Sequence, residues 1–380
     1  MLCRAGMAAL VGAALLAVFA PAQSPTELEK NKGVGDSPDT ALPLATDLRP
    51  DLTHDAVRAA MRKVAGWQLE RARPYFSSDW TFAALYDGFM AAATLGDDKY
   101  RQAMHAMGEK LNWQPGPRLE HADDVAVGQV YLELYLKQKD SRILPPLTER
   151  FAYQTGLKDD PAKPLWWWCD GLFMGPPTLA RLYKATGKSE YLDFMDREWW
   201  ITSQLLYDPE EHLYFRDARY LGKHEGNGRK LFWSRGNGWV MGGIARVLDY
   251  MPKNYAARPK YIAQFREMAA AVMKVQGEDG LWRSGLLDSQ AYPLPEASGS
   301  AFIAYALAWG VNQGILDRTA YAPAARKAWA GLLTHVYADG RLGCIQPVGA
   351  APGQFKATSS FVYGVGAFLL AGSQMDRLHF

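Results

Sequence analysis

"WTFAALYDGFMAAATLGDDKYRQAMHAMGEKL", residues 80–111, consists of two apolar runs separated by a short polar break. The first run places apolar side chains three and four residues apart, the spacing of an amphipathic helix. These side chains are Phe82, Leu85, Phe89 and Ala92. A Gly-Asp-Asp sequence at 96–98 interrupts the pattern, and a second amphipathic run follows it. The stretch therefore predicts a helical hairpin.

Units of the same kind recur along the chain, with helix breaks near residues 96, 139, 187, 252, 314 and 372. The breaks lie roughly 40 to 65 residues apart, whereas open helical solenoids have shorter and more uniform repeats. A single hairpin cannot bury its apolar face alone, so the units must pack on one another. We therefore predict an all-α fold, a closed (α/α)6 barrel of six inner and six outer helices. A few short strands or long loops, within 207–229 and 278–296, are expected at the active-site face.

The N-terminal residues predict export. Residues 1–22 resemble a secretory signal peptide, because Arg4 precedes an apolar run that is too short to span a bilayer and ends in Ala-Pro-Ala. A buried N-terminal helix is the alternative. Residues 23–49 are rich in Pro, Asp, Gly and Lys, which predicts a flexible arm or linker. Residues 50–380 are predicted to form a single domain, periplasmic or secreted, with no membrane insertion after signal cleavage.

The composition excludes several classes of partner. There are 42 Lys and Arg against 40 Asp and Glu, a formal net charge of +2, which gives no case for nucleic-acid binding. His121 and His212 lack a partner at metal-ligand spacing, and no phosphate-binding glycine loop is present, so neither a metal nor a cofactor is predicted. Cys169 and Cys344 allow one disulfide at most. The sequence leaves the oligomeric state open. The 13 Trp, 19 Tyr and 15 Phe provide flat faces suited to sugar rings.

Asp170 lies in the apolar stretch "WWWCDGLFMGPP", residues 166–177. A carboxylate there is costly unless it is paired, protonated or used in chemistry. No basic residue lies within five positions of Asp170, which disfavours a local pair. Trp166–Trp168 and Cys169 would desolvate the carboxyl group and raise its pKa, and a second carboxylate from Asp123 or Asp124 would raise it further. The stretch therefore predicts a proton donor.

Three more stretches combine aromatic and charged residues: "SDWTFAALYDG" at 78–88, "HADDVAVGQVYLELY" at 121–135 and "FWSRGNGWVMGG" at 232–243. Each has a structural interpretation, since Asp123 or Asp124 could cap a helix and Arg235 could form an ion pair. Sugar-active sites need aromatic platforms, carboxylates for proton transfer and, for acidic sugars, an arginine. Taken together, the stretches therefore predict one sugar-binding pocket.

Three blocks resemble signature sequences of glycoside hydrolase family 105, the unsaturated rhamnogalacturonyl hydrolases and related unsaturated glucuronyl hydrolases, close to family 88. They are "WWWCDGLFMGPP" at 166–177, "FWSRGNGWVMGGIARVL" at 232–248 and "PEASGSAFIAYALAWGVNQGIL" at 295–316. The resemblance extends from about Trp80 to the C-terminal helix and implies an (α/α)6 barrel. It also implies a substrate, an oligosaccharide ending in a 4,5-unsaturated uronic acid left by a polysaccharide lyase. The implied reaction hydrates the double bond instead of displacing at the anomeric carbon.

The resemblance also implies residue roles. Asp170 matches the general acid/base, which protonates carbon 4 and activates the water that adds at carbon 5. Asp123 matches the second carboxylate, with the adjacent Asp124 as its rival. In place of a histidine found in other members, the loop "LYFRDARY" provides Arg216. The expected substrate-binding side chains are Arg235, Trp239, Trp233, Asn237, Trp80, Tyr86, Trp167, Trp168 and Arg216.

Two other functions fit parts of the sequence. A sugar epimerase on the same barrel would need two well-placed bases, usually histidines, and the chain has 7 histidines in all. A non-catalytic periplasmic oligosaccharide-binding protein would not need the Asp170 motif. Ser234 and Ser298 lie in no nucleophile-elbow pattern, which argues against a serine hydrolase.

Overall fold

The computed structural model describes residues 33–158, 160 and 163–378, and the signal peptide predicted over 1–22 lies outside them. Two sets of helices make up most of the described chain. The outer set is α2 (His54–Ala72), α4 (Lys99–Lys110), α7 (Leu144–Thr155), α10 (Glu190–Leu206), α12 (Arg258–Met273) and α14 (Arg318–Leu333). The inner set is α3 (Trp80–Ala93), α5 (Ala122–Val125), α6 (Gly128–Gln138), α8 (Gly171–Met174), α9 (Pro176–Thr186), α11 (Ser234–Leu248), α13 (Ala297–Asn312) and α15 (Val362–Met375).

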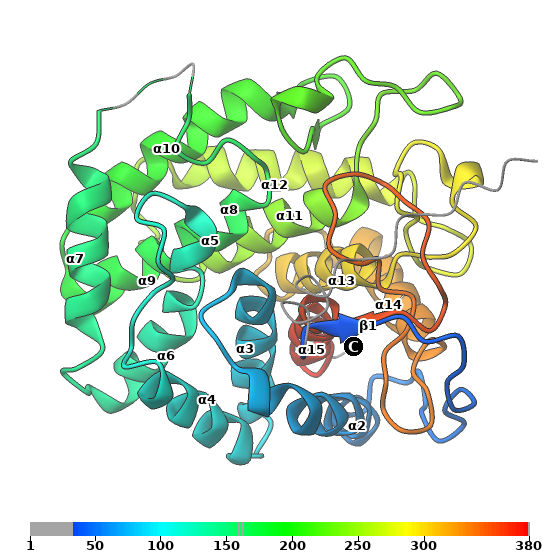
Figure 1. Ribbon diagram of the computed structural model, residues 1–380. Coiled ribbons are helices and arrows are strands. Elements are labelled where there is room, and N and C mark those ends of the chain that lie inside the picture. The colour runs from blue at the N-terminus through cyan, green and yellow to red at the C-terminus, as the bar shows by residue number, and fades with distance from the viewer. Residues whose placement is uncertain (1–32, 159, 161–162, 379–380) are drawn as a thin grey trace, which may run out of the picture. The chain divides into compact units, whose positions relative to one another are not determined.

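The inner helices close into a ring (Figure 1). Going round it, α3 contacts α6, α6 contacts α9, α9 contacts α11, α11 contacts α13, α13 contacts α15, and α15 contacts α3. Two of the six inner positions are split: α5 precedes α6, and α8 precedes α9. The predicted (α/α)6 barrel is confirmed.

The hairpins pair differently from the expected order at the chain ends. The break predicted near residue 372 is wrong, because that residue lies within α15. The sixth outer helix is instead α2, at the start of the domain, where it packs on α15. The start of α2 is capped by Thr53, whose hydroxyl accepts from the Ala56 N–H.

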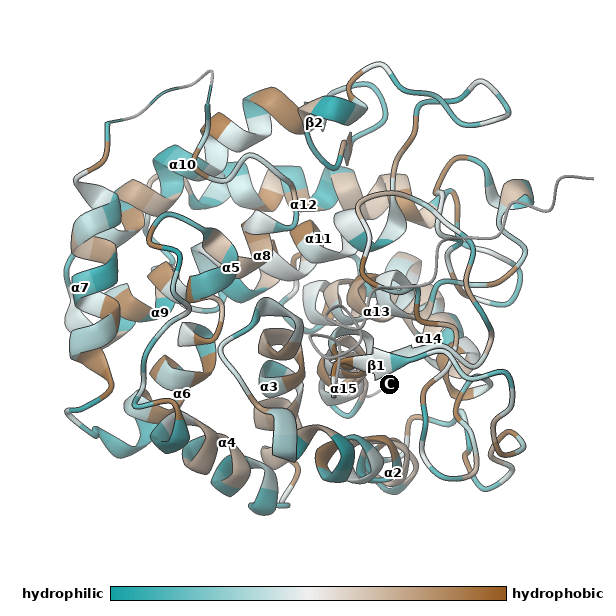
Figure 2. Ribbon diagram, in the orientation of Figure 1, coloured by the Kyte–Doolittle hydropathy of each residue, from teal (hydrophilic) through white to brown (hydrophobic). Residues whose placement is uncertain are grey.

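Glycines allow the inner helices to approach closely. A Cβ on Gly88 of α3 would lie 2.7 Å from the Gly366 carbonyl oxygen of α15. A Cβ on Gly238 of α11 would lie 3.1 Å from the Gly299 carbonyl oxygen of α13. Because α13 and α15 are buried on nearly every side, their residues are apolar or small throughout, whereas outer helices such as α7 alternate between hydrophilic and hydrophobic stretches (Figure 2).

Short strands occur in one of the two predicted ranges, 207–229, where β2 (Tyr207–Asp208) pairs antiparallel with β3 (Leu213–Tyr214). A second pair lies outside both ranges, since β1 (Gly35–Asp36) pairs antiparallel with β4 (Ser360–Phe361). Residues 33–49 therefore differ from the flexible arm expected over 23–49, since Asp36 also forms an ion pair with Arg341. Residues 23–32 lie outside the described part. No helix among the described residues is long and apolar enough to cross a membrane.

Candidate active site

The N-terminal ends of the inner helices meet at one face of the barrel. Trp80, the first residue of α3, stacks on Tyr363 of α15 with ring centres 5.7 Å apart. Arg235, in the first turn of α11, lies 3.8 Å from the carboxylate of Glu296, which caps α13. Asp170 directly precedes α8 at the same face. The fold thus brings together residues far apart in the sequence, such as Trp80 and Tyr363, which are separated by 283 positions.

Asp170 is buried, with 7 % of its surface exposed. Its Oδ2 lies 3.6 Å from the Cys169 thiol and 3.3 Å from Nε of Arg216. The contact with Arg216 is an ion pair without hydrogen-bond geometry. No basic residue lies near Asp170 in the sequence, but folding brings Arg216 to it from the loop after β3. Burial raises the pKa of Asp170, and the positive charges of Arg216 and Arg235 oppose that rise.

Asp123 and Asp124 lie in different surroundings. Asp124 is held by Arg118, which donates to its two oxygens from the side chain and to one of them from the backbone N–H. Asp123 lies 3.4 Å from His121 and 3.7 Å from Arg118, and burial together with repulsion from Asp170 raises the pKa of Asp123 to about 7. The two carboxylates that interact are thus Asp123 and Asp170, while both oxygens of Asp124 are occupied by Arg118.

His121 completes the wall beside Asp123. Its Nδ1 accepts from the Asp123 backbone N–H at 3.3 Å, and its ring centre lies 4.5 Å from that of Trp168. Burial, with help from Arg118, lowers the pKa of His121 to about 4, so the ring is neutral at neutral pH. No group of three or more potential metal ligands occurs within the described ranges.

The three consecutive tryptophans have three environments. Trp166 is fully buried and packs against Phe194 at 6.1 Å between ring centres. Trp168 is 3 % exposed and lies against His121. Trp167 is 42 % exposed, and the Arg216 guanidinium lies 5.5 Å from its ring centre. Of the three tryptophans, Trp167 is therefore the one that solvent or a ligand can reach, together with the neighbouring Arg216.

Arg235 lies deeper than a substrate-binding arginine would be expected to lie. It is 1 % exposed, and its Nη1 and Nη2 donate to the carbonyls of Gln346 and Pro347 at 2.7 and 2.8 Å. The guanidinium also lies between the rings of Trp233 and Tyr363, at 4.4 and 4.8 Å from their centres. Its donors thus hold the loop that begins at Gln346. Its positive charge also opposes the rise in the pKa of Asp170.

Most of the other expected contact residues are also buried. Trp239 packs between Phe173 and Trp80, the Asn237 amide bonds the Tyr214 backbone, and the Tyr86 hydroxyl donates to the Ser77 carbonyl. The exposed fractions of Trp233, Trp239, Asn237 and Tyr86 are all 2 % or less. They form the layer beneath the cavity, and Trp80, which is half-buried, lies at its edge.

Sequence reasoning missed Arg118, Glu296 and Gln346. Gln346 accepts from the Trp233 indole and the Ser284 hydroxyl, and its backbone N–H donates to Glu296. Glu296 is the second residue of the block that begins at Pro295 and directly precedes α13, so its place before a helix was visible as a capping pattern. Nothing in the local sequence marks Gln346 or Arg118, because their partners are distant in the chain or lie in an irregular loop.

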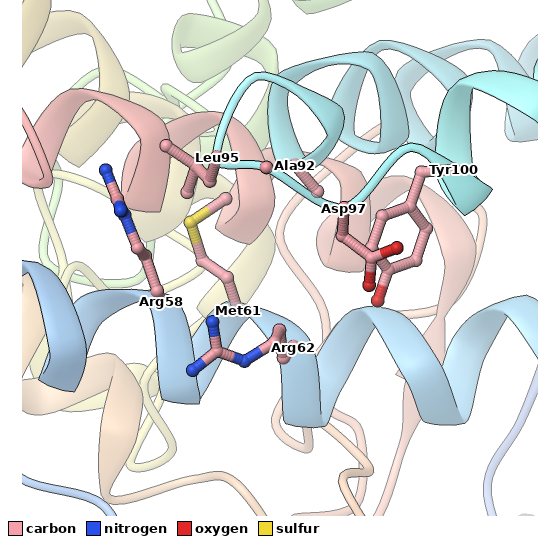
Figure 3. A pocket seen from close by; sticks show the side chains of 8 residues that line it. Arg58, Met61, Arg62, Ala92, Leu95, Asp97 and Tyr100 are labelled. Carbon is pink, nitrogen blue, oxygen red and sulfur yellow. The ribbon is translucent and has the colours of Figure 1, made fainter.

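A second cavity lies outside this site. It has a volume of about 210 Å³ and is situated between α2 and the link from α3 to α4, at the opposite end of α3 from Trp80 (Figure 3). Arg58, Arg62, Asp97 and Tyr100 line it. Its place at the far end of an inner helix separates it from the Asp123 and Asp170 carboxylates.

A closed helical barrel with two interacting buried carboxylates and tryptophans at its inner-helix ends defines an enzyme of the sugar-hydrolysing class. Residues 53–379 match the family Glycosyl Hydrolase Family 88, and the chain belongs to this family.

Relatives and solved structures agree. The chain is 41 % identical over 364 residues to an unsaturated 3S-rhamnoglycuronyl hydrolase of Formosa agariphila, covering 89 % of this chain and 95 % of the relative. It is 31 % identical over 368 residues to a protein of the same name from Alteromonas sp. (strain LOR), covering 87 % and 89 %. A glycosyl hydrolase family 88 structure from Bacteroides vulgatus superposes with a TM-score of 0.82 at 32 % identity, covering 86 % of this chain and all of that one.

Proposed function

We propose that the protein removes the terminal 4,5-unsaturated uronic acid from lyase-generated oligosaccharides by hydrating the double bond. We also propose that it is a member of glycoside hydrolase family 105, which is related to family 88. The observation that carries the proposal is the repulsion between the half-buried Asp123 and the buried Asp170, which lies beside Arg216. A buried pair of carboxyl groups holds a proton near neutral pH, which proton transfer to a carbon atom requires.

In the proposed reaction Asp170 protonates carbon 4 of the ring. The positive charge that develops at carbon 5 and the ring oxygen is stabilised by Asp123, which ionises more readily once Asp170 carries the proton, because repulsion from Asp170 is one cause of the raised pKa of Asp123. Asp170 then takes a proton from the water that adds at carbon 5, so it is restored without a net gain or loss of protons. The hemiketal opens to a ketone at carbon 5, and the hemiacetal at carbon 1 then releases the rest of the oligosaccharide.

We assign the uronate carboxylate to Arg216. Its guanidinium is 15 % exposed and donates from Nη1 to Asp217 at 2.7 Å, whereas both terminal nitrogens of the 1 % exposed Arg235 donate to backbone carbonyls. When the substrate carboxylate pairs with Arg216, it offsets the positive charge that opposes the pKa rise of Asp170. Substrate binding would thereby favour the protonated form of Asp170. Trp167 offers the exposed aromatic face for a sugar ring.

For the substrate class we favour rhamnoglycuronyl oligosaccharides over rhamnogalacturonyl ones. Two relatives that align with most of the chain are named for the former. We also propose that the protein is exported by residues 1–22, which N-terminal sequencing of the mature protein checks directly.

The test follows the ultraviolet absorbance of the unsaturated uronate during incubation with lyase digests of rhamnose- and uronate-containing polysaccharides. Wild type should remove the absorbance, while Asp170→Asn, nearly equal in volume, should slow its loss by at least about a hundredfold. Circular dichroism confirms that the variant is folded. Constant absorbance with every digest contradicts the proposal, and tight binding without turnover would indicate an oligosaccharide-binding protein.

A further inference from the structure

The turn that carries Asp170 has an unusual connection to the next helix. α8 is a single turn of four residues, and Pro176 and Pro177 begin α9 directly after Gly175. In a continuous helix the N–H groups at 176 and 177 would donate to the carbonyls of Leu172 and Phe173. Proline has no N–H, so both carbonyls lose their helical donor. A one-turn helix with two such carbonyls cannot hold its geometry without outside contacts.

Neighbouring inner helices contact both carbonyls. The Leu172 carbonyl oxygen lies against the backbone of α11 at Gly243, where an added Cβ would approach it to 2.3 Å. The Phe173 carbonyl accepts from Nε2 of Gln129, on α6, at 2.8 Å. Gln129 is fully buried, so no water competes for this bond. The side-chain amide of Gln129 therefore takes the place of the missing Pro177 donor.

Arg246 fixes the orientation of the Gln129 amide. Nε of Arg246, on α11, donates to Oε1 of Gln129 at 2.7 Å, so the amide nitrogen must face Phe173. Arg246 is itself fixed by ion pairs with Asp87 at 2.7 Å and Glu133 at 3.1 Å. The chain of contacts runs from this buried ion cluster through Gln129 to α8, and the Phe173 N–H in turn donates to the Asp170 carbonyl.

We propose that Gln129 is a positioning residue for Asp170: its amide, oriented by Arg246, replaces the helical donor that Pro177 lacks and fixes the turn that presents the carboxyl group. Gln129 does not touch the substrate. The inference rests on the proposed function for its effect on turnover, while its effect on the turn itself does not depend on which substrate is used.

The experiment compares three variants. Gln129→Leu removes the donor and the acceptor, and Gln129→Glu keeps the acceptor for Arg246 but removes the donor. Gln374→Leu is the matched control, because Gln374 is also buried and its Oε1 accepts from Asn312 at 3.1 Å at the far end of α15. Turnover is measured on a lyase digest that wild type consumes, and amide hydrogen exchange is measured over residues 171–175.

Misplacing a catalytic group by about 1 Å costs on the order of a hundredfold in rate, so both Gln129 variants should lower kcat by about ten- to a hundredfold. Their KM should stay within about twofold of wild type, because Gln129 contacts no substrate. Exchange over 171–175 should be faster by at least about tenfold, as local opening of the turn becomes easier. The control should lower the melting temperature while leaving kcat and this exchange unchanged.

Gln129 variants that melt earlier but keep wild-type kcat would overturn the proposal and leave Gln129 with a structural role only. Where Gln129→Leu fails to fold, Gln129→Glu decides by the same criterion. If wild type consumes none of the digests, the proposed function fails, and exchange alone then judges the positioning. Unchanged exchange over 171–175 in the Gln129 variants overturns it in that case as well.

Discussion

Replacing Asp123 with asparagine tests the carboxyl pair through protein stability as well as activity. Burial and repulsion from Asp170 raise the pKa of Asp123 to about 7 in the folded protein. In the unfolded chain an aspartate titrates near its ordinary pKa of about 3.9. The folded state therefore prefers protonated Asp123. As the pH rises toward 7, ionisation of this aspartate stabilises the unfolded chain but not yet the folded protein, so wild type loses stability. Asparagine does not titrate, so the variant avoids that loss.

The size of the effect follows from the two pKa values. Between pH 5 and pH 7 the unfolded chain carries the charge and the folded protein does not, at a cost of about 1.4 kcal/mol per pH unit. The free energy of unfolding of Asp123→Asn relative to wild type should therefore rise by about 3 kcal/mol between pH 5 and pH 8. With about 2 cal/mol/K of unfolding entropy per residue, that difference corresponds to about 4 °C in melting temperature for a domain of this size.

The assay is scanning calorimetry of both proteins at pH 5 and pH 8, with turnover measured in parallel. Any contact that asparagine loses to Arg118 lowers stability at both pH values and cancels in the comparison. Asp124→Asn is the control, because Asp124 is bound by Arg118 and its replacement removes that ion pair. The control should be destabilised at both pH values.

A melting-temperature difference between Asp123→Asn and wild type that is the same at pH 5 and pH 8 would refute the reasoning. So would a difference that shrinks as the pH rises, since this would mean that the folded state favours ionised Asp123. The expected pattern, higher stability with lower turnover, is the usual cost of maintaining like charges in a catalytic site.

The remaining predictions concern the mouth of the site. Arg216→Gln should raise KM by about tenfold, because it removes the charge that would hold the uronate. It should also move the upper pH limit of activity to higher pH, since Arg216 opposes the rise in the pKa of Asp170, and a pH profile of kcat/KM shows this. Trp167→Ala should raise KM by about tenfold with little change in melting temperature, because the side chain is 42 % exposed; substrate titration and calorimetry check both parts.

The helical periodicity predicted the fold because each hairpin buries an apolar face that its own residues reveal. The periodicity could not predict which outer helix pairs with which inner helix at the two ends of the domain. The last predicted break, at residue 372, lies in an inner helix that is apolar on all sides, where periodicity carries no information about facing. The arm at 33–49 looked like a linker in composition, but two residues of strand pairing and the ion pair of Asp36 with Arg341 were enough to order it.

The sequence named side chains that lie close together, but it did not reveal their depth. Arg216 contacts Asp170, and repulsion from Asp170 raises the pKa of Asp123. Sequence alone could not show that Arg235 would be enclosed by carbonyls of the loop at Gln346, because that loop lies 111 residues away and has no motif. It also could not choose between Asp123 and Asp124, because Arg118 lies near both and only the distances distinguish them, 2.7 Å to Asp124 against 3.7 Å to Asp123.

The Asp170 stretch shows why a catalytic motif can require residues far outside itself. Gly175, Pro176 and Pro177 break the inner helix, so that Asp170 sits on a one-turn helix beside the cavity instead of within a long rigid one. The break leaves two carbonyls without helical donors, and a buried carbonyl without a partner costs about 1–3 kcal/mol. For the Phe173 carbonyl, the amide of Gln129 offsets that cost. The two prolines therefore require a barrel in which Gly243 leaves room for the Leu172 carbonyl and Gln129 donates to the Phe173 carbonyl. Since Gly243 and Gln129 lie on other inner helices, the position of Asp170 depends on how the inner helices close into a ring.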